Sequence, residues 1–180
     1  MHYKATLMSE KEIANAVKRV SYEIVEQSGS CSDLLLLGIR RRGVPLAKRM
    51  AANIKLIEGL DVPVGELDIT FYRDDLSRID RDPVLKSADV GFDVTGKRVV
   101  IVDDVLYTGR TARAALEAVI DLGRPADIRL AILVDRGHRE LPIHANFVGK
   151  NIPTSRQEFI AVRMMEYDGR NCVDLFTKED

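Results

Sequence analysis

Hydrophobic positions in the first third of the chain follow one helical pattern and then one continuous run. Apolar residues recur at helical spacing over residues 13–24, directly after the pair Ser9 and Glu12, which is typical of a capped helix start. We expect this helix to end near Gly29. The apolar run at residues 33–39 predicts a strand that is buried on both faces.

The same alternation of strand and helix continues through the middle of the chain. Gly43 and Pro45 open a second helical pattern, which Gly59 closes. Further patterns predict strands at residues 62–72, 98–102 and 128–134 and a helix through residues 112–120. Strands that alternate with helices imply right-handed crossovers and a mainly parallel sheet covered on both faces, so the predicted fold class is α/β.

The pattern changes in two places. After Asp135 the helical spacing stops, and residues 146–150, 158–164 and 172–177 predict short strands that form a cap over the sheet. Residues 73–89 are densely charged and contain few apolar positions. A long insertion of this kind is either a lid over a binding site or a surface loop, and the pattern alone leaves both interpretations open.

Composition places the chain among soluble globular proteins. It has 180 residues, of which 46% are hydrophobic and 31% charged, so we expect a single domain over residues 1–180. The amino terminus lacks the apolar core of a signal peptide and no apolar run approaches a membrane span, which predicts a cytoplasmic protein without membrane contact. Cys31 and Cys172 are expected to be reduced packing residues. A net charge of -1 means that any nucleic-acid binding needs a local basic face.

Two adjacent acids carry the strongest chemical signal. Asp103 and Asp104 follow the apolar run at residues 98–102, and ligands of an open parallel sheet bind beyond the carboxyl ends of its strands. Residues 108–111 then form a Thr/Gly turn that opens the next helix, where free backbone N–H groups favour a phosphate. Carboxylates that accept hydrogen bonds from vicinal hydroxyls beside such a cradle suit a phosphorylated sugar.

Other ligand classes are disfavoured by spacing. No G-x-G-x-x-G motif follows a predicted strand, which argues against a dinucleotide-binding fold. Residues 91–98 imitate a phosphate-binding P-loop, but Arg98 stands at the magnesium-binding Ser/Thr position and the motif precedes a strand, so we interpret the segment as a turn. The three histidines show no metal-binding spacing, and no metal site built from protein side chains is predicted.

The segment VVIVDDVLYTGRT resembles the phosphoribosyl pyrophosphate (PRPP) signature of type I phosphoribosyltransferases. Three further segments, GIRRRGVPLAKR, DITFYRDDL and LVDRGHRELPIHANFVGKNIPTS, resemble the PyrR family of bifunctional pyrimidine operon attenuation regulators and uracil phosphoribosyltransferases. The resemblance implies a type I phosphoribosyltransferase fold with a flexible lid at about residues 68–89 and a C-terminal hood at about residues 135–180. It also implies the conversion of uracil and PRPP to UMP and pyrophosphate, with Mg²⁺ bound mainly through PRPP.

The resemblance also assigns residues to the reaction. Asp103, Asp104 and the lid residue Arg73 would be catalytic, and Tyr72 would fold with Arg73 toward the substrate. Arg136 and the backbone around Ile160 would bind uracil. The assigned PRPP-binding residues are Arg41, Arg42, Asp103, Asp104, Val105, Leu106, Tyr107, Thr108, Gly109, Arg110 and Thr111.

The family further implies UMP-dependent binding of a stem-loop in pyrimidine operon mRNA, which promotes transcription termination, and a homodimer or larger homo-oligomer. Basic and aromatic residues on the first helix and in the hood are the candidates for RNA contact: Lys18, Arg19, Tyr22, His138, Arg139, His144 and Lys150. Two alternatives are a non-catalytic nucleotide-sensing RNA-binding regulator and a salvage phosphoribosyltransferase for a purine base without RNA binding. The intact acids argue against the first alternative, and the hood segment against the second.

Overall fold

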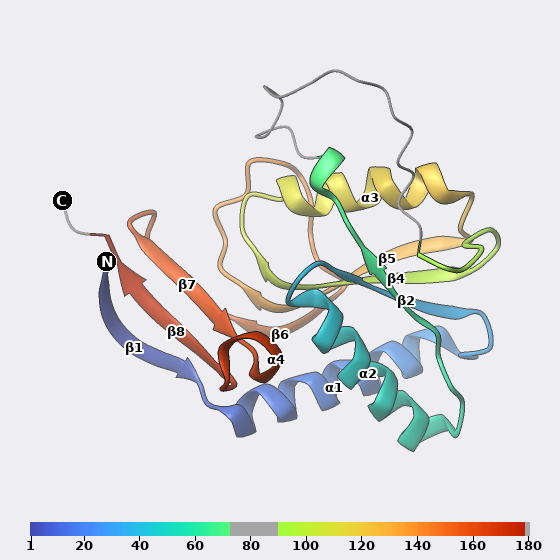
Figure 1. The fold of residues 1–180 in the computed structure, drawn as a ribbon, viewed down its shortest axis with the longest axis horizontal. Coiled ribbons are helices and arrows are strands. Elements are labelled where there is room, and N and C mark those ends of the chain that lie inside the picture. The colour runs from blue at the N-terminus through green and yellow to red at the C-terminus, as the bar shows by residue number, and fades with distance from the viewer. Residues whose placement is uncertain (73–89, 179–180) are drawn as a thin grey trace.

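The computed structural model describes residues 1–72 and 90–178, and its strands form two sheets (Figure 1). The larger sheet is parallel, in the order β3-β2-β4-β5-β6, and the smaller is antiparallel, in the order β1-β8-β7. The strands of the larger sheet are β2 (Leu34–Ile39), β3 (Val64–Leu67), β4 (Arg98–Leu106), β5 (Asp127–Asp135) and β6 (Phe147–Asn151). Those of the smaller, here called the hood sheet, are β1 (His2–Met8), β7 (Glu158–Arg163) and β8 (Cys172–Thr177).

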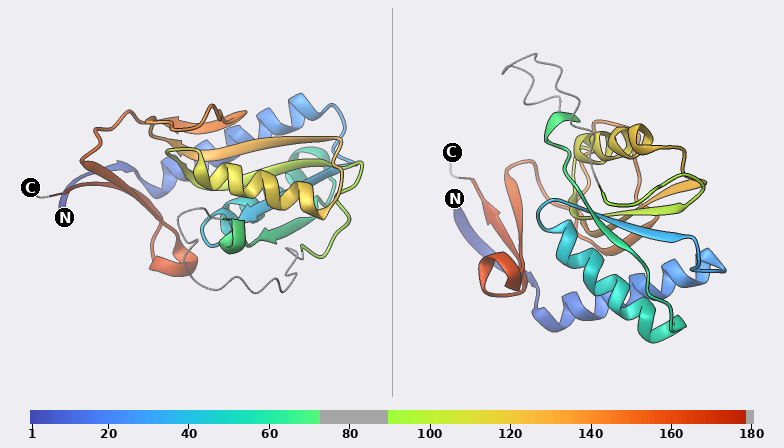
Figure 2. Two further views of the ribbon diagram at one scale, coloured as in Figure 1. Left: turned by 90° about the horizontal axis from the view of Figure 1, so that it is seen from above. Right: turned by 45° about the vertical axis from the view of Figure 1, so that its right-hand side comes forward.

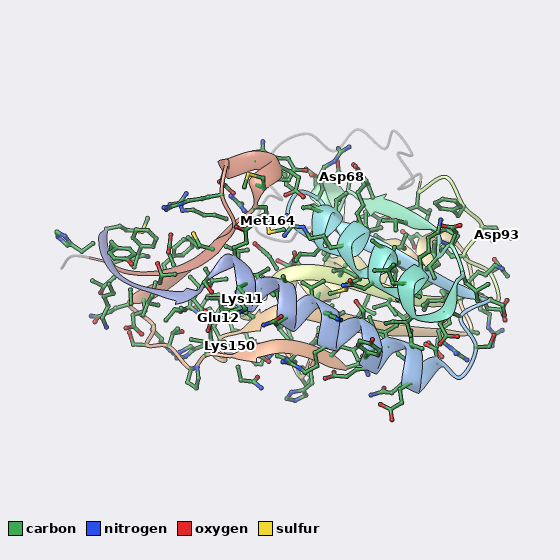
Figure 3. The ribbon with its side chains drawn as sticks, turned by 90° about the horizontal axis from the view of Figure 1, so that it is seen from below. Lys11, Glu12, Asp68, Asp93, Lys150 and Met164 are labelled. Atoms are coloured by element: carbon green, nitrogen blue, oxygen red, sulfur yellow. The ribbon has the colours of Figure 1, made fainter. Side chains whose placement is uncertain are left out.

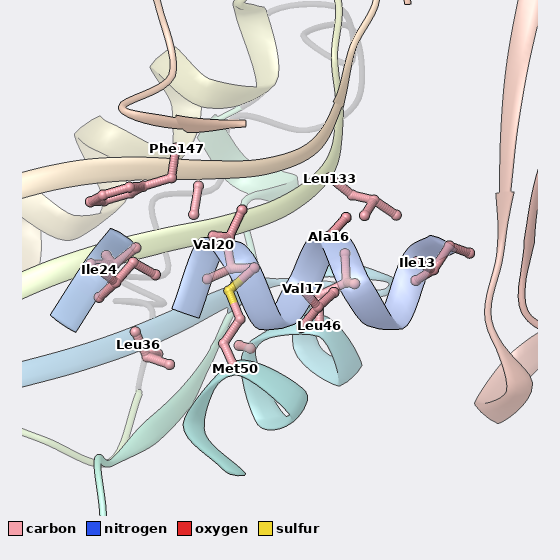
Figure 4. Packing of buried hydrophobic residues seen from close by; sticks show 14 of the residues in the cluster. Ile13, Ala16, Val17, Val20, Ile24, Leu36, Leu46, Met50, Leu133 and Phe147 are labelled. Atoms are coloured by element: carbon pink, nitrogen blue, oxygen red, sulfur yellow. The ribbon is translucent and has the colours of Figure 1, made fainter. Parts of the chain in front are cut away.

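Helices cover both faces of the parallel sheet. α1 (Glu10–Ser28) and α2 (Gly43–Glu58) pack on one face and α3 (Arg110–Leu122) on the other (Figure 2). A one-turn 3-10 helix, η1 (Thr70–Tyr72), follows β3, and a short helix, α4 (Met165–Asp168), precedes β8. Figure 4 shows the apolar stripe of α1, from Ile13 to Ile24, facing side chains of α2 and of the sheet. Burial of that stripe is the main stabilisation expected for an amphipathic helix.

The strand order explains where a ligand can bind. The chain passes from β2 outward to β3 and then returns to β4 on the other side of β2, so the order reverses between β2 and β4. The loops at the carboxyl ends of two such strands diverge and leave a crevice, which is the usual ligand site of open α/β sheets. The loop 40–42 and the segment 103–109 flank this point.

The predicted α/β class, the mainly parallel sheet and the three long helices are confirmed. The predicted strand at residues 62–72 is too long: β3 ends at Leu67, because the Asp68 carboxylate accepts hydrogen bonds from the Thr70 N–H at 3.0 Å and the Thr70 hydroxyl at 2.6 Å and forms a turn. Residues 91–97 form the turn expected in place of a P-loop. Both cysteines are buried and free, as predicted.

Two strands belong to a different sheet, or to a different part of the chain, than the sequence predicted. The segment expected at residues 146–150 does not join the cap; it is β6, the edge strand of the parallel sheet, where Phe147 pairs with Ala131 of β5. The hood sheet instead gains β1, which no hydrophobic pattern predicted because residues 1–6 are exposed. Periodicity reports which face of a strand is buried and does not report its neighbour. No helix in the described ranges is long and apolar enough to cross a bilayer.

Two glycines allow the loop after β2 to lie against β4. A Cβ atom on Gly43 would stand 2.2 Å from the Val102 carbonyl oxygen, and one on Gly38 would stand 2.5 Å from the Val44 Cα. Both neighbours are backbone atoms, which cannot turn aside as a side chain would. The close approach of loop 40–42 to the carboxyl end of β4 therefore depends on these two positions.

We expect Gly43→Ala to lower the free energy of unfolding by at least about 2 kcal/mol, because the added methyl forces backbone shifts in a packed interior. Urea denaturation followed by circular dichroism measures this. Gly59→Ala is the control: nothing lies within 4 Å of that position, so it should cost only the about 1 to 2 kcal/mol of a left-handed backbone. If both variants lost the same free energy of unfolding, the close approach of Gly43 to the Val102 carbonyl would not contribute to the effect.

Candidate active site

Asp103 and Asp104 lie in the second half of β4 and enter the crevice at its carboxyl end. Asp103 is buried and Asp104 half-buried. Oδ1 of Asp103 accepts the Asp104 N–H at 2.9 Å, and Oδ1 of Asp104 accepts the Val105 N–H at 2.8 Å. Each carboxylate is thus fixed by the next backbone amide.

The environment of these carboxylates opposes their charge. Burial raises the pKa of Asp103 well above its usual range, and the neighbouring Asp104 raises it further. Burial also raises the pKa of Asp104, although the bond with Asp103 and the charge of Arg42 oppose that shift. Two like charges in a desolvated site need a cation or several hydrogen-bond donors. The pair is therefore suited to a ligand that brings hydroxyl groups or a metal ion.

The turn after β4 forms the first half of the crevice. A cavity of about 230 Å³ is lined by Asp103 and by all seven residues predicted for the phosphate cradle, from Val105 to Thr111. Gly109 adopts φ 93° directly before α3, a left-handed conformation that favours glycine, and so turns the chain into the helix. The free N–H groups of the first turn of α3 therefore lie at this cavity, where they favour a phosphate.

The loop after β2 forms the second half. A cavity of about 380 Å³ joins residues 40–42 to the carboxylate pair, and it shares Asp103, Val105 and Thr111 with the first cavity. The structure therefore brings the predicted PRPP residues together in one crevice. Its additional lining residues Asp68, Ile69 and Thr70 follow β3; the sequence placed them in the lid and did not assign them to PRPP binding.

The three consecutive arginines of this loop have different partners. Arg40 pairs with Asp68 at 2.9 Å and with Glu66 at 3.3 Å. Arg42 pairs with Asp168 of α4 at 3.1 Å. Arg41 is exposed, lines the cavity, and forms no ion pair within the described part of the chain. Arg41 is thus the cation of this loop that is available to an anionic ligand.

The predicted uracil residues occupy the boundary between the crevice and the hood sheet. The Arg136 guanidinium lies over the Tyr107 ring, 4.1 Å from its centroid, and donates to the backbone carbonyls of Ser155 and Glu158 at 3.0 and 2.8 Å. These bonds fix the segment before β7 against the end of β5. The Ile160 side chain is buried in the core, so the structure leaves only its backbone as a candidate contact.

The structure describes only part of the segment that was predicted to form the lid. Arg73 and the rest of residues 73–89 lie outside them. Tyr72 is described, and its hydroxyl donates to Asp121 of α3 at 2.9 Å, so it points toward that helix and not toward the crevice as expected. Burial raises the pKa of Tyr72, and the Asp121 carboxylate adds to the effect, which keeps the hydroxyl protonated.

The predicted RNA residues separate into groups. Lys18, Arg19 and Tyr22 are exposed on α1, which packs beside β6, and Arg19 donates to backbone carbonyls of β6. Figure 3 shows Lys11 and Glu12 of α1 near Lys150 of β6, whose ammonium lies 3.8 Å from the Glu12 carboxylate. Arg19 and Glu12 therefore lie at the contact between α1 and β6.

The other predicted RNA residues lie elsewhere. Arg139 donates to the carbonyls of Ile143 and Tyr107 and pairs with Asp135, so its guanidinium holds the loop after β5. His138 contacts the Thr154 carbonyl and the edge of Tyr107. His144 is exposed at a small cavity beside α3. Two of these three side chains have partners within the protein, and the RNA role of all three stays a prediction.

Known proteins resemble the chain over nearly its whole length. Residues 5–167 match the family described as phosphoribosyl transferase domain. A Bifunctional protein PyrR from Thermus aquaticus is 57% identical, over 99% of each chain, and one from Deinococcus radiodurans is 53% identical, over 98% of this chain and 97% of the relative. The chain belongs to the PyrR family of phosphoribosyltransferases.

The structure of this PyrR-family chain is also similar to solved phosphoribosyltransferases. The hypoxanthine phosphoribosyltransferase of Trypanosoma cruzi has a TM-score of 0.75 at 18% identity, over 98% of each chain. A hypoxanthine phosphoribosyltransferase from Staphylococcus aureus has a TM-score of 0.72 at 20% identity, over 96% of this chain and 92% of its own. At this identity the likeness establishes the type I phosphoribosyltransferase fold, as the sequence predicted.

We expect Asp103→Asn to raise the free energy of unfolding by about 1 to 3 kcal/mol above neutral pH, because it removes a buried charge with no cation partner while retaining an oxygen for the Asp104 N–H. The pKa of Asp103 is higher in the folded than in the unfolded chain, so the wild-type protein loses stability as pH rises through the folded value. Thermal unfolding from pH 5 to 9 measures the difference between the two proteins. A difference that does not grow with pH would contradict the assignment of a raised pKa.

Proposed function

We propose that this chain transfers the phosphoribosyl group of PRPP to uracil and regulates pyrimidine operon transcription by binding mRNA in the presence of UMP. One observation carries the catalytic half of the proposal. A single crevice joins an arginine loop, a carboxylate pair and a phosphate-binding turn, and these match the three parts of PRPP in order: pyrophosphate, ribose and 5′-phosphate.

Each part of the crevice has a chemical task. The N–H groups around residues 108–111 hold the 5′-phosphate, and the carboxylates of Asp103 and Asp104 accept hydrogen bonds from the ribose hydroxyls. Arg41 and Arg42 face the pyrophosphate. Mg²⁺ would be held mainly through PRPP, where the Asp103 and Asp104 carboxylates could offer it hard oxygen atoms, and it would supply positive charge beside the leaving group.

The reaction is a displacement at the anomeric carbon. A bond forms between a ring nitrogen of uracil and this carbon, the bond to the pyrophosphate oxygen breaks, and the nitrogen loses its proton. Positive charge develops on the ribose while negative charge gathers on pyrophosphate. Carboxylates beside the ribose and guanidinium groups beside the leaving group stabilise both changes, so the fixed charges of the crevice perform most of the catalysis.

The place for the base lies between Tyr107 and the hood sheet. Arg136 orders this boundary through its bonds to Ser155 and Glu158, and the carbonyl and N–H groups near Ile160 are candidates to read the edge of uracil. A purine base would need a different boundary, because base choice is made where the base is bound. The alternative is a salvage enzyme for a purine base. Measuring the reaction of PRPP with uracil and with purine bases distinguishes the two.

The structural support for RNA binding is the shared surface of α1 and β6. Lys18 and Tyr22 are exposed there, and Lys11 lies on the same helix. A local cluster of cations on a chain with net charge -1 can still bind phosphates. Assembly as a homodimer or larger oligomer stays a prediction.

We expect Asp104→Asn to keep the fold and lose at least about 100-fold in the rate of UMP formation at saturating substrates, because an amide cannot balance the developing positive charge. Steady-state kinetics with uracil and PRPP measure the loss, and circular dichroism checks the fold. Glu117→Gln, an exposed acid on α3, is the matched control and should behave as wild type. Near-normal turnover of the Asp104 variant would remove this carboxylate from the mechanism.

We expect Lys18→Ala to weaken binding of pyrimidine operon RNA while leaving UMP formation unchanged, because Lys18 lies on α1 and not at the crevice. One lost phosphate contact reduces the slope of log affinity against log salt by about 0.7 to 0.9. Filter binding across a salt series, with and without UMP, measures both the slope and the nucleotide dependence. Lys97→Ala, which removes a lysine just before β4, is the control. RNA affinity that is indifferent to salt and to UMP would leave an enzyme without this regulatory role.

A further inference from the structure

An acidic residue of α4 holds one of the crevice arginines. Both oxygens of the Asp168 carboxylate accept hydrogen bonds from Nη2 of Arg42, at 3.1 and 3.2 Å. Arg42 is the residue directly before α2, whereas Asp168 is the last residue of α4, which leads into the hood sheet. The contact therefore connects the arginine loop of the crevice with the far end of the chain.

The Arg42 guanidinium is only partly satisfied by this contact. Its Nε atom is buried and has no hydrogen-bond partner within the described residues. Its positive charge also acts on Asp104, whose pKa it lowers against the effect of burial. Arg42 thus contacts the Asp168 carboxylate and lines the same cavity as the carboxylate pair of β4. A buried, unpartnered donor at the wall of a cavity has hydrogen-bonding capacity for a ligand.

Asp168 is itself held in place. Burial opposes its charge, but the N–H of Met164 at 2.9 Å and the Arg42 guanidinium keep the pKa of Asp168 below its usual value. Arg163 lies 4.0 Å away and also pairs with the buried Asp174 at 3.4 Å. A carboxylate with these partners stays ionised and fixed, so it can orient a guanidinium group.

We propose that Asp168 is a positioning residue for the leaving-group half of the crevice: it holds Arg42 toward the pyrophosphate of PRPP and away from Asp104. This inference rests on the proposed function and deepens it. Without the Asp168 charge, the nearest strong attraction for Arg42 is the carboxylate pair of β4, where it would occupy the place of the ribose and its metal ion. The affinity for PRPP depends on Asp168 in consequence, and the affinity for uracil does not.

The primary test is Asp168→Asn. We expect the KM for PRPP to rise about tenfold, as for loss of one well-placed charge-assisted hydrogen bond, while kcat and the KM for uracil stay within about twofold. Asp168→Glu restores the charge and should recover most of the affinity for PRPP. A second readout is calorimetric binding of pyrophosphate with Mg²⁺, which needs no turnover and should weaken by the same factor.

Glu166→Gln is the matched control. Glu166 lies on the same short helix and also pairs with an arginine, Arg49, at 3.0 Å, but Arg49 does not line either cavity. This variant removes an equivalent ion pair from α4 and should leave the KM for PRPP unchanged. An equal loss in both variants would mean that α4 acts only through the stability of the hood sheet, which overturns the proposal.

A double variant tests whether the effect passes through Arg42. In an Arg42→Ala background, Asp168→Asn should cause no further loss of pyrophosphate affinity, since its partner is already absent. Additive losses, or an equal rise in both substrate constants, would overturn the proposal.

Two further outcomes are also decisive. If Asp168→Asn does not fold, pyrophosphate binding by Asp168→Glu decides: affinity within about threefold of wild type supports the proposal, and a loss of tenfold or more overturns it. If the wild-type protein binds pyrophosphate but forms no UMP, the proposed uracil reaction fails, and the calorimetric series still tests Asp168.

Discussion

Two adjacent carboxylates at the carboxyl end of β4 impose the main constraint on this structure. Asp103 is buried and Asp104 half-buried, and their neighbours supply two backbone amides and one nearby guanidinium group, that of Arg42. Such a pair is unfavourable in the empty protein and becomes favourable when hydroxyl groups and a metal ion arrive. The fold holds the pair in place through β4, the central strand, which lies between β2 and β5.

The placement of the arginines follows from the same constraint. Three consecutive cations repel one another, and two of them have acidic partners: Arg40 pairs with Glu66 of β3 and with Asp68 just after it, and Arg42 pairs with Asp168 of α4. Arg41 keeps its charge available at the cavity. The loop can lie this close to the carboxylates only because Gly38 and Gly43 lack a Cβ atom. The electrostatics of the crevice therefore depend on a steric feature of the backbone.

The parts of the site that are contiguous in sequence were predictable, and the parts that depend on tertiary neighbours were not. The acids and the Thr/Gly turn are contiguous in sequence, so one local pattern found both; Asp103 and the turn line one cavity and Asp104 lines the adjoining one. The acids lie within β4, which runs four residues beyond the predicted strand at 98–102. Nothing in the sequence around Asp168 indicates that it meets Arg42, which lies 126 positions away. The sequence likewise shows that Arg136 and Arg139 are cations. It does not show that their guanidinium N–H groups donate to backbone carbonyls. The exposed β1 and the position of β6 also depend on pairing partners, which hydrophobic periodicity does not encode.

One stretch of the hood holds two arginines that follow strands of the parallel sheet. At the start of β7, the backbone carbonyls of Ser155 and Glu158 receive the Arg136 guanidinium from the end of β5. Just after β7, Asp168 receives Arg42 from the loop that precedes α2. The strand between these contacts is short and paired with β8. One stretch of the hood therefore holds both Arg136 and Arg42, so two side chains that follow different strands of the parallel sheet share one support.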